Sequence, residues 1–237
     1  MQSINKKKVI IFGGSSGIGS ATAKLLSSEY DVLIASRTSP PESLSDCQWV
    51  RCDVTDTEEV STFMSGLEPT VFAVINCAGS GVYSPFNMDF ASYWKTIVDT
   101  NLLGALHVSC ATSEFLSECE HLITVGSIAA KRPSPTPGND VYAAAKQAVA
   151  RTMDDLRLRL RAQASSLRVT TITPGFVEGT QFGKDFFRSA PDQATQLYGA
   201  FQSLQPEDVA QSIYWCLSQP THVEISDIII RPREQSI

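Results

Sequence analysis

The chain has 237 residues, of which 43% are hydrophobic and 19% charged, a composition that supplies a large core and leaves little room for long disordered stretches. Its formal net charge of −6 excludes the overall basic character of proteins that bind nucleic acid. No apolar run approaches the roughly 18 to 20 residues of a membrane span, and Met1–Lys8 lacks the apolar core of a signal peptide, so we expect a cytoplasmic protein that does not enter a membrane.

The first predicted unit is Val9–Gly19, in which apolar residues run into a turn of glycine and serine before a helix over Ser20–Glu29. Such a turn directs backbone N–H groups and the positive end of a helix dipole at one point, which suits a pyrophosphate. Its glycines, Gly13, Gly17 and Gly19, have G-x-x-x-G-x-G spacing instead of the commoner G-x-G-x-x-G. Taken alone, the motif is also compatible with a glycine-rich turn that binds nothing.

The second predicted strand, Asp31–Ser36, is followed by Arg37 and Thr38. A site for NAD usually has an acidic residue here, which binds the ribose 2′-hydroxyl. A guanidinium with nearby hydroxyls suits a 2′-phosphate instead, and Ser15 and Ser16 in the glycine turn could assist it. The pattern favours NADP over NAD, the alternative being an arginine that only ends a strand in solvent.

In the next α/β unit, a loop replaces the helix that would normally connect the two strands. Thr38–Cys47 is too short and too rich in proline for a helix, and we expect a loop there. Strands are predicted over Gln48–Cys52 and Val71–Ile75, the latter ending in Asn76–Gly79. Small residues at the carboxyl end of a parallel strand let a ligand approach the backbone.

Asp89–Cys119 is predicted to be one long helix. Asn101 and Gly104 lie in its middle, and both are poor helix formers, which indicates a functional reason for their presence. A strand over His121–Val125 follows and ends at Ser127. The apolar face of the long helix is expected to comprise Trp94, Ile97, Val98, Leu102, Leu106 and Cys110.

After a proline-rich loop, Lys131–Asn139, the sequence predicts a helix over Val141–Ala162 with Asp140 as its cap. A strand over Leu167–Thr173 and an irregular aromatic segment, a substrate lid at about 176–205, come next. The inner face of the helix carries Tyr142, Lys146, Val149, Met153, Leu156 and Leu160. Its outer face carries the arginines Arg151, Arg157, Arg159 and Arg161, expected to be solvated or interfacial.

A helix over Pro206–Leu217 and a last strand over Glu224–Arg231 complete the chain. Strands and helices alternate throughout, with no repeat and no linker. This order predicts a Rossmann-type, doubly wound parallel sheet of about seven strands in a three-layer α/β/α arrangement, with residues 1–237 forming a single domain for cofactor binding and catalysis.

Six cysteines are scattered through the chain without C-x-x-C spacing: Cys47, Cys52, Cys77, Cys110, Cys119 and Cys216. Four of them lie in or beside apolar segments. This distribution favours buried, reduced thiols over disulfides or a metal site, and we expect no bound metal.

Tyr142 and Lys146 are one helical turn apart, so both project from the same helix face. A phenol with a pKa near 10 is a poor acid–base catalyst at neutral pH, and a nearby ammonium lowers that pKa. Ser127, at the end of the preceding strand, could bind the same substrate oxygen. The three residues are suited to proton transfer between a hydroxyl and a carbonyl, although a lone Tyr-x-x-x-Lys pair also occurs on surface helices.

Together these segments resemble the short-chain dehydrogenase/reductase family, in its NADP-dependent branch, over nearly the whole chain. The family's turn T-G-x-x-x-G-I-G appears as Phe12–Gly19, with phenylalanine in place of threonine. Its N-x-A-G motif appears as Asn76–Gly79, and its adenine-contacting aspartate as Asp53. The ending over Pro220–Pro232 resembles the branch that acts on small hydroxy acids and similar carbonyls.

The resemblance implies a catalytic tetrad of Asn101, Ser127, Tyr142 and Lys146. In this family the tyrosine is the acid–base, and the lysine lowers its pKa and holds the nicotinamide ribose. The serine orients the substrate, and the asparagine holds a water in a proton relay. The Ser127–Tyr142 loop is slightly long for the family, which would reshape the mouth of the substrate site.

The resemblance also implies the residues that bind the cofactor. Pro174 and Gly175 resemble the motif that contacts the nicotinamide, with Thr180 as the threonine that reaches its carboxamide, at a spacing one residue longer than usual. The full implied set is Gly13, Ser15, Ser16, Gly17, Ile18, Gly19, Arg37, Thr38, Asp53, Val54, Asn76, Ala78, Gly79, Tyr142, Lys146, Pro174, Gly175, Val177 and Thr180.

The sequence therefore predicts an NADP(H)-dependent oxidoreductase that interconverts a secondary alcohol and a ketone or aldehyde, with Tyr142 as acid–base. A non-catalytic NADP(H)-binding regulator of the same fold is the alternative. A methyltransferase with a similar glycine turn would have no use for Arg37. The expected partners are a small carbonyl or alcohol substrate and copies of the chain itself, in a homodimer or homotetramer.

Overall fold

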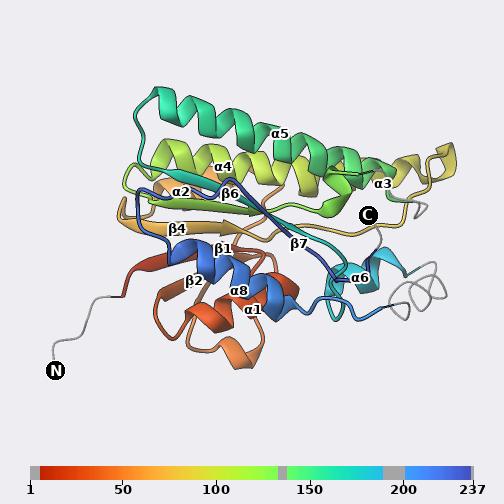
Figure 1. Cartoon of the computed structure of the whole chain (residues 1–237), viewed down its shortest axis with the longest axis horizontal. Helices are drawn as coiled ribbons and strands as arrows, with labels where there is room; N and C mark the ends of the chain where they lie inside the picture. The colour runs from red at the N-terminus through yellow and green to blue at the C-terminus, as the bar shows by residue number, and fades with distance from the viewer. Residues whose placement is uncertain (1–5, 133–137, 189–200, 236–237) are drawn as a thin grey trace.

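A seven-stranded parallel sheet in the order β3-β2-β1-β4-β5-β6-β7 forms the centre of the computed structural model (Figure 1). The structure describes residues 6–132, 138–188 and 201–235. The strands are β1 Lys8–Phe12, β2 Asp31–Ser36, β3 Gln48–Arg51, β4 Val71–Asn76, β5 His121–Val125, β6 Arg168–Pro174 and β7 Asp227–Ile230. The strand order reverses between β1 and β4, and ligands of such sheets bind at the carboxyl ends beside that reversal. The predicted fold class is confirmed.

Helices cover both faces of the sheet, with α2, α4 and α5 on one face and α1 and α8 on the other (Figure 1). The helices are α1 Gly17–Leu26, α2 Thr57–Ser65, α3 Ala91–Val98, α4 Gly104–Phe115, α5 Asp140–Ala162, α6 Gln181–Phe186 and α8 Pro206–Leu217. Short 3₁₀ turns lie at Glu42–Leu44, Met88–Phe90 and Ile128–Ala130, and a π-helical turn at Asp99–Leu103. No helix in the described part of the chain is long and apolar enough to cross a membrane.

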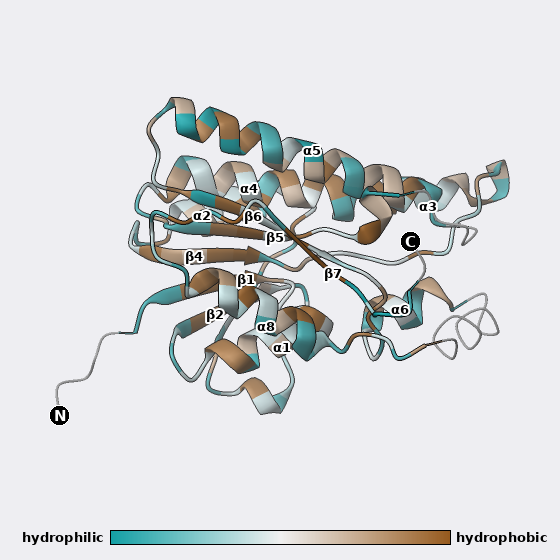
Figure 2. Cartoon of the chain, viewed as in Figure 1, coloured by the Kyte–Doolittle hydropathy of each residue, from teal (hydrophilic) through white to brown (hydrophobic). Residues whose placement is uncertain are grey.

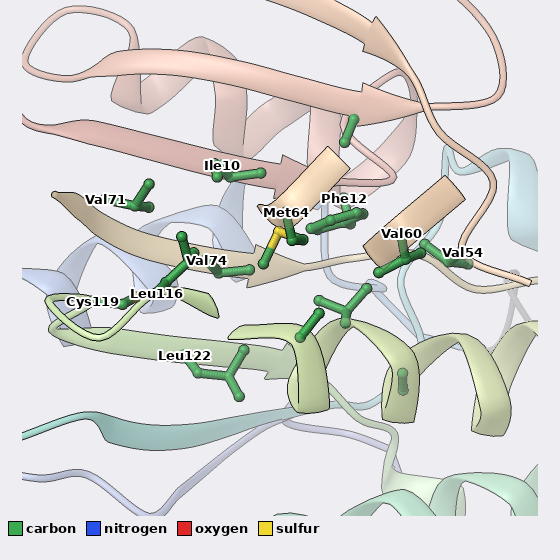
Figure 3. Close-up of a cluster of buried hydrophobic side chains, with 14 of the residues drawn as sticks. Ile10, Phe12, Val54, Val60, Met64, Val71, Val74, Leu116, Cys119 and Leu122 are labelled. Atoms are coloured by element: carbon green, nitrogen blue, oxygen red, sulfur yellow. The ribbon is translucent and has the colours of Figure 1, made fainter. Parts of the chain in front are cut away.

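Two hydrophobic cores result from the alternation of side chains along buried strands. On β1, Ile10 and Phe12 belong to the core beneath α2, α4 and α5, shown in Figure 3. Val9 and Ile11 belong to the core beneath α1 and α8. Because both faces are covered, the central strands β1 and β4 are apolar over most of their length, as the brown colour of β4 shows in Figure 2.

The cysteines follow the apolar pattern in part. Cys52, Cys119 and Cys216 are buried in the two cores, whereas Cys110 is exposed. Burial raises the pKa of Cys119 to about 11 and that of Cys216 to about 12, and these thiols are therefore protonated at neutral pH.

The predicted single helix over Asp89–Cys119 is wrong. The segment divides into α3, the π-helical turn Asp99–Leu103 and α4, and it ends at Phe115. The π turn shifts the phase of the helix, so Val108 and Ser109 face the core while Cys110 faces solvent. π turns of this kind are frequent at functional sites.

Other boundaries move by a few residues. Helix α1 begins at Gly17 because the glycine turn runs directly into it. Asn139, not Asp140, precedes the first residue of α5, whose predicted buried stripe is confirmed. Arg157, one of the arginines expected to be solvated or interfacial, instead bonds within the chain: its guanidinium donates to the carbonyl oxygens of Val169 and Ser226 at 3.0 Å each.

Candidate active site

A cleft of about 680 Å³ opens along the carboxyl edge of the sheet. Its lining comes from the ends of β1, β2, β4, β5 and β6 and from α5 and α6. The predicted site residues that line it are Gly13, Ser15, Ser16, Gly17, Ile18, Arg37, Thr38, Val54, Ala78, Gly79, Asn101, Ser127, Tyr142, Lys146, Pro174, Gly175, Val177 and Thr180. The structure therefore brings residues predicted from distant segments to one cavity.

The glycine turn after β1 has the backbone that a phosphate site requires. Gly13 and Gly17 have φ values of +72° and +52°, which residues with a side chain rarely adopt. A Cβ on Gly13 would lie 2.7 Å from the backbone nitrogen of Ala78. Ser16 precedes α1 and makes no side-chain hydrogen bond to it, which leaves the first N–H groups of the helix to a ligand. The turn fits a pyrophosphate.

Three predicted cofactor residues do not line the cleft but shape its wall. A Cβ on Gly19 would lie 2.3 Å from the carbonyl oxygen of Gly13, so the glycine lets α1 pack against the turn. The side-chain oxygen of Asn76 accepts a hydrogen bond from the Ala78 N–H at 3.0 Å. The third residue, Asp53, accepts hydrogen bonds from the backbone N–H and the hydroxyl of Thr55 at 3.0 and 2.9 Å.

Asp53 also interacts electrostatically with Arg37 at the end of β2. Burial raises its pKa, but the two Thr55 hydrogen bonds and the positive charge of Arg37 outweigh burial, so the pKa lies below its usual value. The carboxylate holds the turn after β3, and its neighbour Val54 reaches the cleft.

Hydroxyl groups and one guanidinium gather at the end of β2. The Ser15 and Thr38 hydroxyls are 3.2 Å apart. The buried Ser36 donates to the Thr38 carbonyl oxygen at 2.8 Å and accepts from the Trp49 indole at 3.1 Å. Arg37 is exposed at the rim and forms no hydrogen bond or ion pair with any residue the structure describes. The donor set fits a phosphate monoester.

Asn101 is fully buried in the π-helical turn. Its amide nitrogen donates to the Ile97 carbonyl at 3.0 Å and to the Ser80 carbonyl at 2.9 Å. Its oxygen accepts from the Ser80 N–H at 3.3 Å. A Cβ on Gly79 would lie 3.2 Å from this oxygen and 3.8 Å from Lys146 Nζ. Asn101 thus ties the segment after β4 to the turn, beside Lys146.

Tyr142 and Lys146 are both buried on α5. Lys146 Nζ donates to the Val125 carbonyl at 3.0 Å and lies 5.9 Å from the centre of the Tyr142 ring. Burial lowers the pKa of Lys146 to about 8. Burial raises the pKa of Tyr142 to about 12, against a hydrogen bond with the Ser127 side chain that lowers it. The Tyr142 pKa is therefore raised, not lowered as expected from the sequence, because burial of the phenol outweighs its hydrogen bond with Ser127.

An aromatic wall, defined here as Tyr83, Phe182 and Phe186, stands beside Tyr142. The ring centres of Tyr142 and Phe182 are 5.2 Å apart, and Phe182 stacks on Phe186 at 6.0 Å. Phe186 meets Tyr83 edge-on at 6.1 Å. The sequence indicated aromatic residues in this segment, but no pattern indicated which of them reaches the tyrosine.

Thr180 caps the N-terminus of α6 and brings this helix close to the glycine turn. Its hydroxyl accepts a hydrogen bond from the Gly183 N–H at 3.1 Å. A Cβ on Gly17 would lie 3.4 Å from its methyl group. The predicted lid over about 176–205 falls partly outside the described residues, and α6 is the helix described within it.

Sequence reasoning missed several residues that line the cleft: Arg132, Asn139, Asp185 and Gln235. Arg132 is exposed, whereas Gln235 is buried near the end of the described chain. Gln235 has no signal in the sequence of its own segment. The related feature in the sequence is the glycine at position 175. The structure explains it, because a Cβ there would come within 2.2 Å of the Gln235 side-chain oxygen.

Comparisons with known proteins agree with this architecture. The model of the short chain dehydrogenase family matches residues 7–190. Human dehydrogenase/reductase SDR family member 11 is 30% identical, over 99% of this chain and 97% of its own. The NADP-dependent 3-hydroxy acid dehydrogenase YdfG of Salmonella typhi is 27% identical, over 96% of each chain.

Among solved structures, the closed form of serine dehydrogenase complexed with NADP+ matches with a TM-score of 0.86 and 26% identity. The match covers 97% of this chain and 96% of that chain. The similarity therefore extends over the sheet and the cleft alike.

Proposed function

Because the chain belongs to the short-chain dehydrogenase family of oxidoreductases, we propose that it interconverts a secondary alcohol and a ketone or aldehyde with NADP(H). The observation that carries this proposal is the meeting of Ser127, Tyr142 and Lys146 in one cleft with the glycine turn. We further propose that cofactor site, substrate site and lid form a single domain.

The glycine turn would hold the pyrophosphate at the start of α1, where backbone N–H groups and the helix dipole favour an anion. Val54, Ala78 and Gly79 would line the adenosine and ribose path, and Pro174, Gly175 and Val177 the nicotinamide. When bound, a nicotinamide cofactor supplies or accepts the hydride.

Tyr142 would move the proton. Since burial raises its pKa to about 12, the phenol is protonated at neutral pH and can donate its proton to a carbonyl oxygen. Ser127, its hydrogen-bond partner, would bind the same oxygen. The Lys146 ammonium, 5.9 Å from the ring centre, would stabilise the phenolate as it forms.

The preference for NADP(H) rests on the end of β2. Arg37 is exposed at the rim of the cleft, with the Ser15 and Thr38 hydroxyls beside it and no acidic residue between Ser36 and Thr38. An NADP+ complex among the similar structures and an NADP-dependent relative support the same choice.

Hydroxy acids are the first substrates to test. One relative is a 3-hydroxy acid dehydrogenase, and one similar structure is a serine dehydrogenase. The C-terminal sequence Pro220–Pro232 also resembles the family branch that acts on small hydroxy acids. A short panel consists of serine, 3-hydroxybutyrate and simple apolar ketones. Comparison of their turnover rates shows whether the site prefers polar hydroxy acids or apolar ketones.

Copies of the chain are the proposed protein partners. Leu103 beside α4 and Leu158 on α5 are 39% and 69% exposed, which supports association through these helices. Light scattering on the purified protein would show a homodimer or homotetramer, and a monomer at micromolar concentration would contradict this part of the proposal.

The test of the reaction is Tyr142→Phe, which removes the proton-carrying hydroxyl and keeps the ring. Turnover of NADPH with a responsive carbonyl should fall by roughly 10²- to 10⁴-fold, as expected for a general acid. NADPH affinity should stay within about two-fold. The readouts are the absorbance of NADPH and a binding titration.

Tyr214→Phe is the matched control, because it removes a hydroxyl that bonds Glu29 on the opposite face of the sheet. It should leave turnover unchanged. Full activity of Tyr142→Phe would refute the mechanism. Cofactor binding by the unaltered protein without turnover on a broad panel would favour a non-catalytic NADP(H)-binding regulator.

A further inference from the structure

We propose that Gln235 donates a side-chain hydrogen bond to an acceptor oxygen of the ligand bound in the cleft, either the nicotinamide carboxamide or the substrate. This inference rests on the proposed function, since it places the ligand beside Gly175. Gln235 lies after β7, which runs toward the end of the molecule where α6 lies (Figure 1). It lines the cleft although it is far in sequence from the other lining residues.

The backbone of Gln235 is fixed at two points. Its N–H donates to the Pro232 carbonyl at 3.2 Å. Its own carbonyl oxygen accepts from the Arg231 guanidinium at 2.6 Å. Gln235 is 8% exposed, so the residue is packed into the protein and does not trail into solvent.

The strand end opposite leaves room for the Gln235 side chain. A Cβ on Gly175 would lie 2.2 Å from the Gln235 Oε1 atom and 2.9 Å from the Arg231 Cβ. The Gly175 φ is not positive, so close approach, and not backbone conformation, requires glycine at this position. Gly175 and Gln235 therefore form one packing unit at the nicotinamide end of the cleft.

The hydrogen bonds also fix which way the amide faces. Oε1 accepts the Phe176 N–H at 3.1 Å, and a backbone N–H requires an oxygen in that place. The Nε2 group must then face the other way. No described residue accepts a hydrogen bond from Nε2. The fully buried polar atoms that lack a partner do not include Nε2, so this atom is accessible from outside the packed protein. Since Gln235 lines the cleft, Nε2 is available to a ligand there.

The chemistry of Nε2 defines what it can bind. An amide nitrogen donates and does not accept, so its partner is a carbonyl, carboxamide or carboxylate oxygen. Both the carboxamide of a nicotinamide and the oxygens of a carbonyl or hydroxy-acid substrate belong to this class. The experiment below separates these two sources.

The decisive variant is Gln235→Glu. A glutamate keeps an oxygen for the Phe176 N–H but replaces the donor with a second acceptor. Affinity for the ligand bound by Nε2 should fall by roughly 10- to 100-fold at pH 8. At this pH the hydrogen bond from Nε2 is lost, and a carboxylate oxygen of the glutamate faces the acceptor oxygen of the ligand. Thermal unfolding should change little, because the structural bond to Phe176 remains.

A shift in pH should reverse the defect. A protonated carboxyl group donates a hydrogen bond again, and the protonated fraction rises as the pH falls toward the ordinary glutamate pKa near 4.3. The ratio of the variant to the unaltered protein should therefore recover by several-fold between pH 8 and pH 5. A residue with a purely structural role would show no such recovery. Glu234→Gln, at the exposed neighbouring position, is the matched control and should change nothing.

Calorimetric titration with NADP+ and with 2′-phospho-ADP-ribose identifies the partner. If the carboxamide is the acceptor, Gln235→Glu weakens NADP+ and leaves the nicotinamide-free probe unchanged. If the substrate is the acceptor, both titrations are unchanged, and the KM for the carbonyl rises at saturating NADPH. Unchanged values in all three measurements would overturn the inference.

The outcome is separable from that of the proposed function. Should Tyr142→Phe abolish turnover while Gln235→Glu leaves all values within about two-fold, the function stands and the role of Gln235 falls. Should the unaltered protein show no turnover, the reaction proposal fails. In a protein without a substrate only the carboxamide remains as the acceptor, so the two titrations then decide the role of Gln235, and unchanged NADP+ affinity refutes it.

Discussion

The proposed cofactor side and the proposed substrate side of the cleft are built in different ways. The cofactor side comes largely from one continuous stretch, Lys8–Thr38, which forms β1, the glycine turn, α1 and β2. The substrate side brings Tyr142 of α5 into contact with Phe182 of α6, which stacks on Phe186, and Phe186 meets Tyr83 after β4. One side is a local motif, and the other is a product of the tertiary fold.

This difference has a physical origin. A pyrophosphate is bound chiefly by backbone N–H groups, so its site needs particular φ angles and close approach, which only glycine provides at Gly13. A substrate pocket needs shape, which side chains from separate elements supply together. Three variants test how independent the two sides are, and one of them changes Lys146, which lies near both Gly79 and Tyr142.

Lys146→Met should have the largest effect on stability. Burial lowers the pKa of Lys146 from 10.5 to about 8, so between these pH values the unfolded chain binds a proton that the folded protein does not. The stability of the unaltered protein relative to the variant should therefore rise with pH across this window, by on the order of 3 kcal/mol when complete. Below pH 8 the buried charge costs stability, and the variant should be the more stable protein.

Urea unfolding at intervals from pH 7 to 10 measures this difference. Titration of other groups cancels to first order when the two proteins are compared. The Tyr142 phenol, with a pKa raised to about 12, acts in the opposite direction only above pH 10. The variant should also lose turnover. A stability difference that is constant with pH would contradict the burial of an ionisable Lys146.

Arg37→Ala tests the cofactor side. Loss of a charge-assisted bond to a 2′-phosphate should weaken NADPH binding by about 1.5–3 kcal/mol, or roughly 10- to 100-fold. NADH carries no such phosphate, and its affinity should not change. Titrations with both cofactors give the ratio directly.

Arg51→Ala is the control for Arg37. Arg51 lies at the end of the neighbouring strand β3 and is paired with Glu59 at 2.7 Å, and its loss should leave the ratio unchanged. Tighter binding of NADH than NADPH by the unaltered protein would show that the interpretation of Arg37 is wrong.

The sequence was most informative where a short motif demands a backbone geometry. The glycine turn, β2, the strand over His121–Val125 and the helix Pro206–Leu217 were predicted closely. The break in Asp89–Cys119 was not, because Asn101 in the π turn exchanges hydrogen bonds with the backbone of Ser80, a residue on another segment. Helical periodicity carries no information about such a contact.

In the candidate site, too, the sequence did not reveal contacts between distant segments. Residues at strand ends could be placed in the cleft because parallel strands bring their carboxyl ends to one edge. The contact of Phe182 with Tyr142 and the position of Gln235 depend on how α6 and the segment after β7 fold back. The pKa of Tyr142 could not be predicted either, since burial, which raises it, is a property of the packed protein.

Phe182→Ala has the smallest expected effect and tests the substrate side alone. The ring lines the cleft 5.2 Å from the Tyr142 ring, so it would pack against an apolar substrate there, and loss of its contact with one or two methylene groups costs about 0.8 kcal/mol for each. The KM for an apolar ketone should therefore rise by a few-fold to roughly ten-fold, with NADPH affinity unchanged. Phe86→Ala, at a ring that is 72% exposed and stacked on Trp94, should alter neither value. If Phe182→Ala weakens NADPH binding as much as ketone binding, α6 serves both sides of the cleft, and the close approach of Thr180 to Gly17 becomes the route by which it does so.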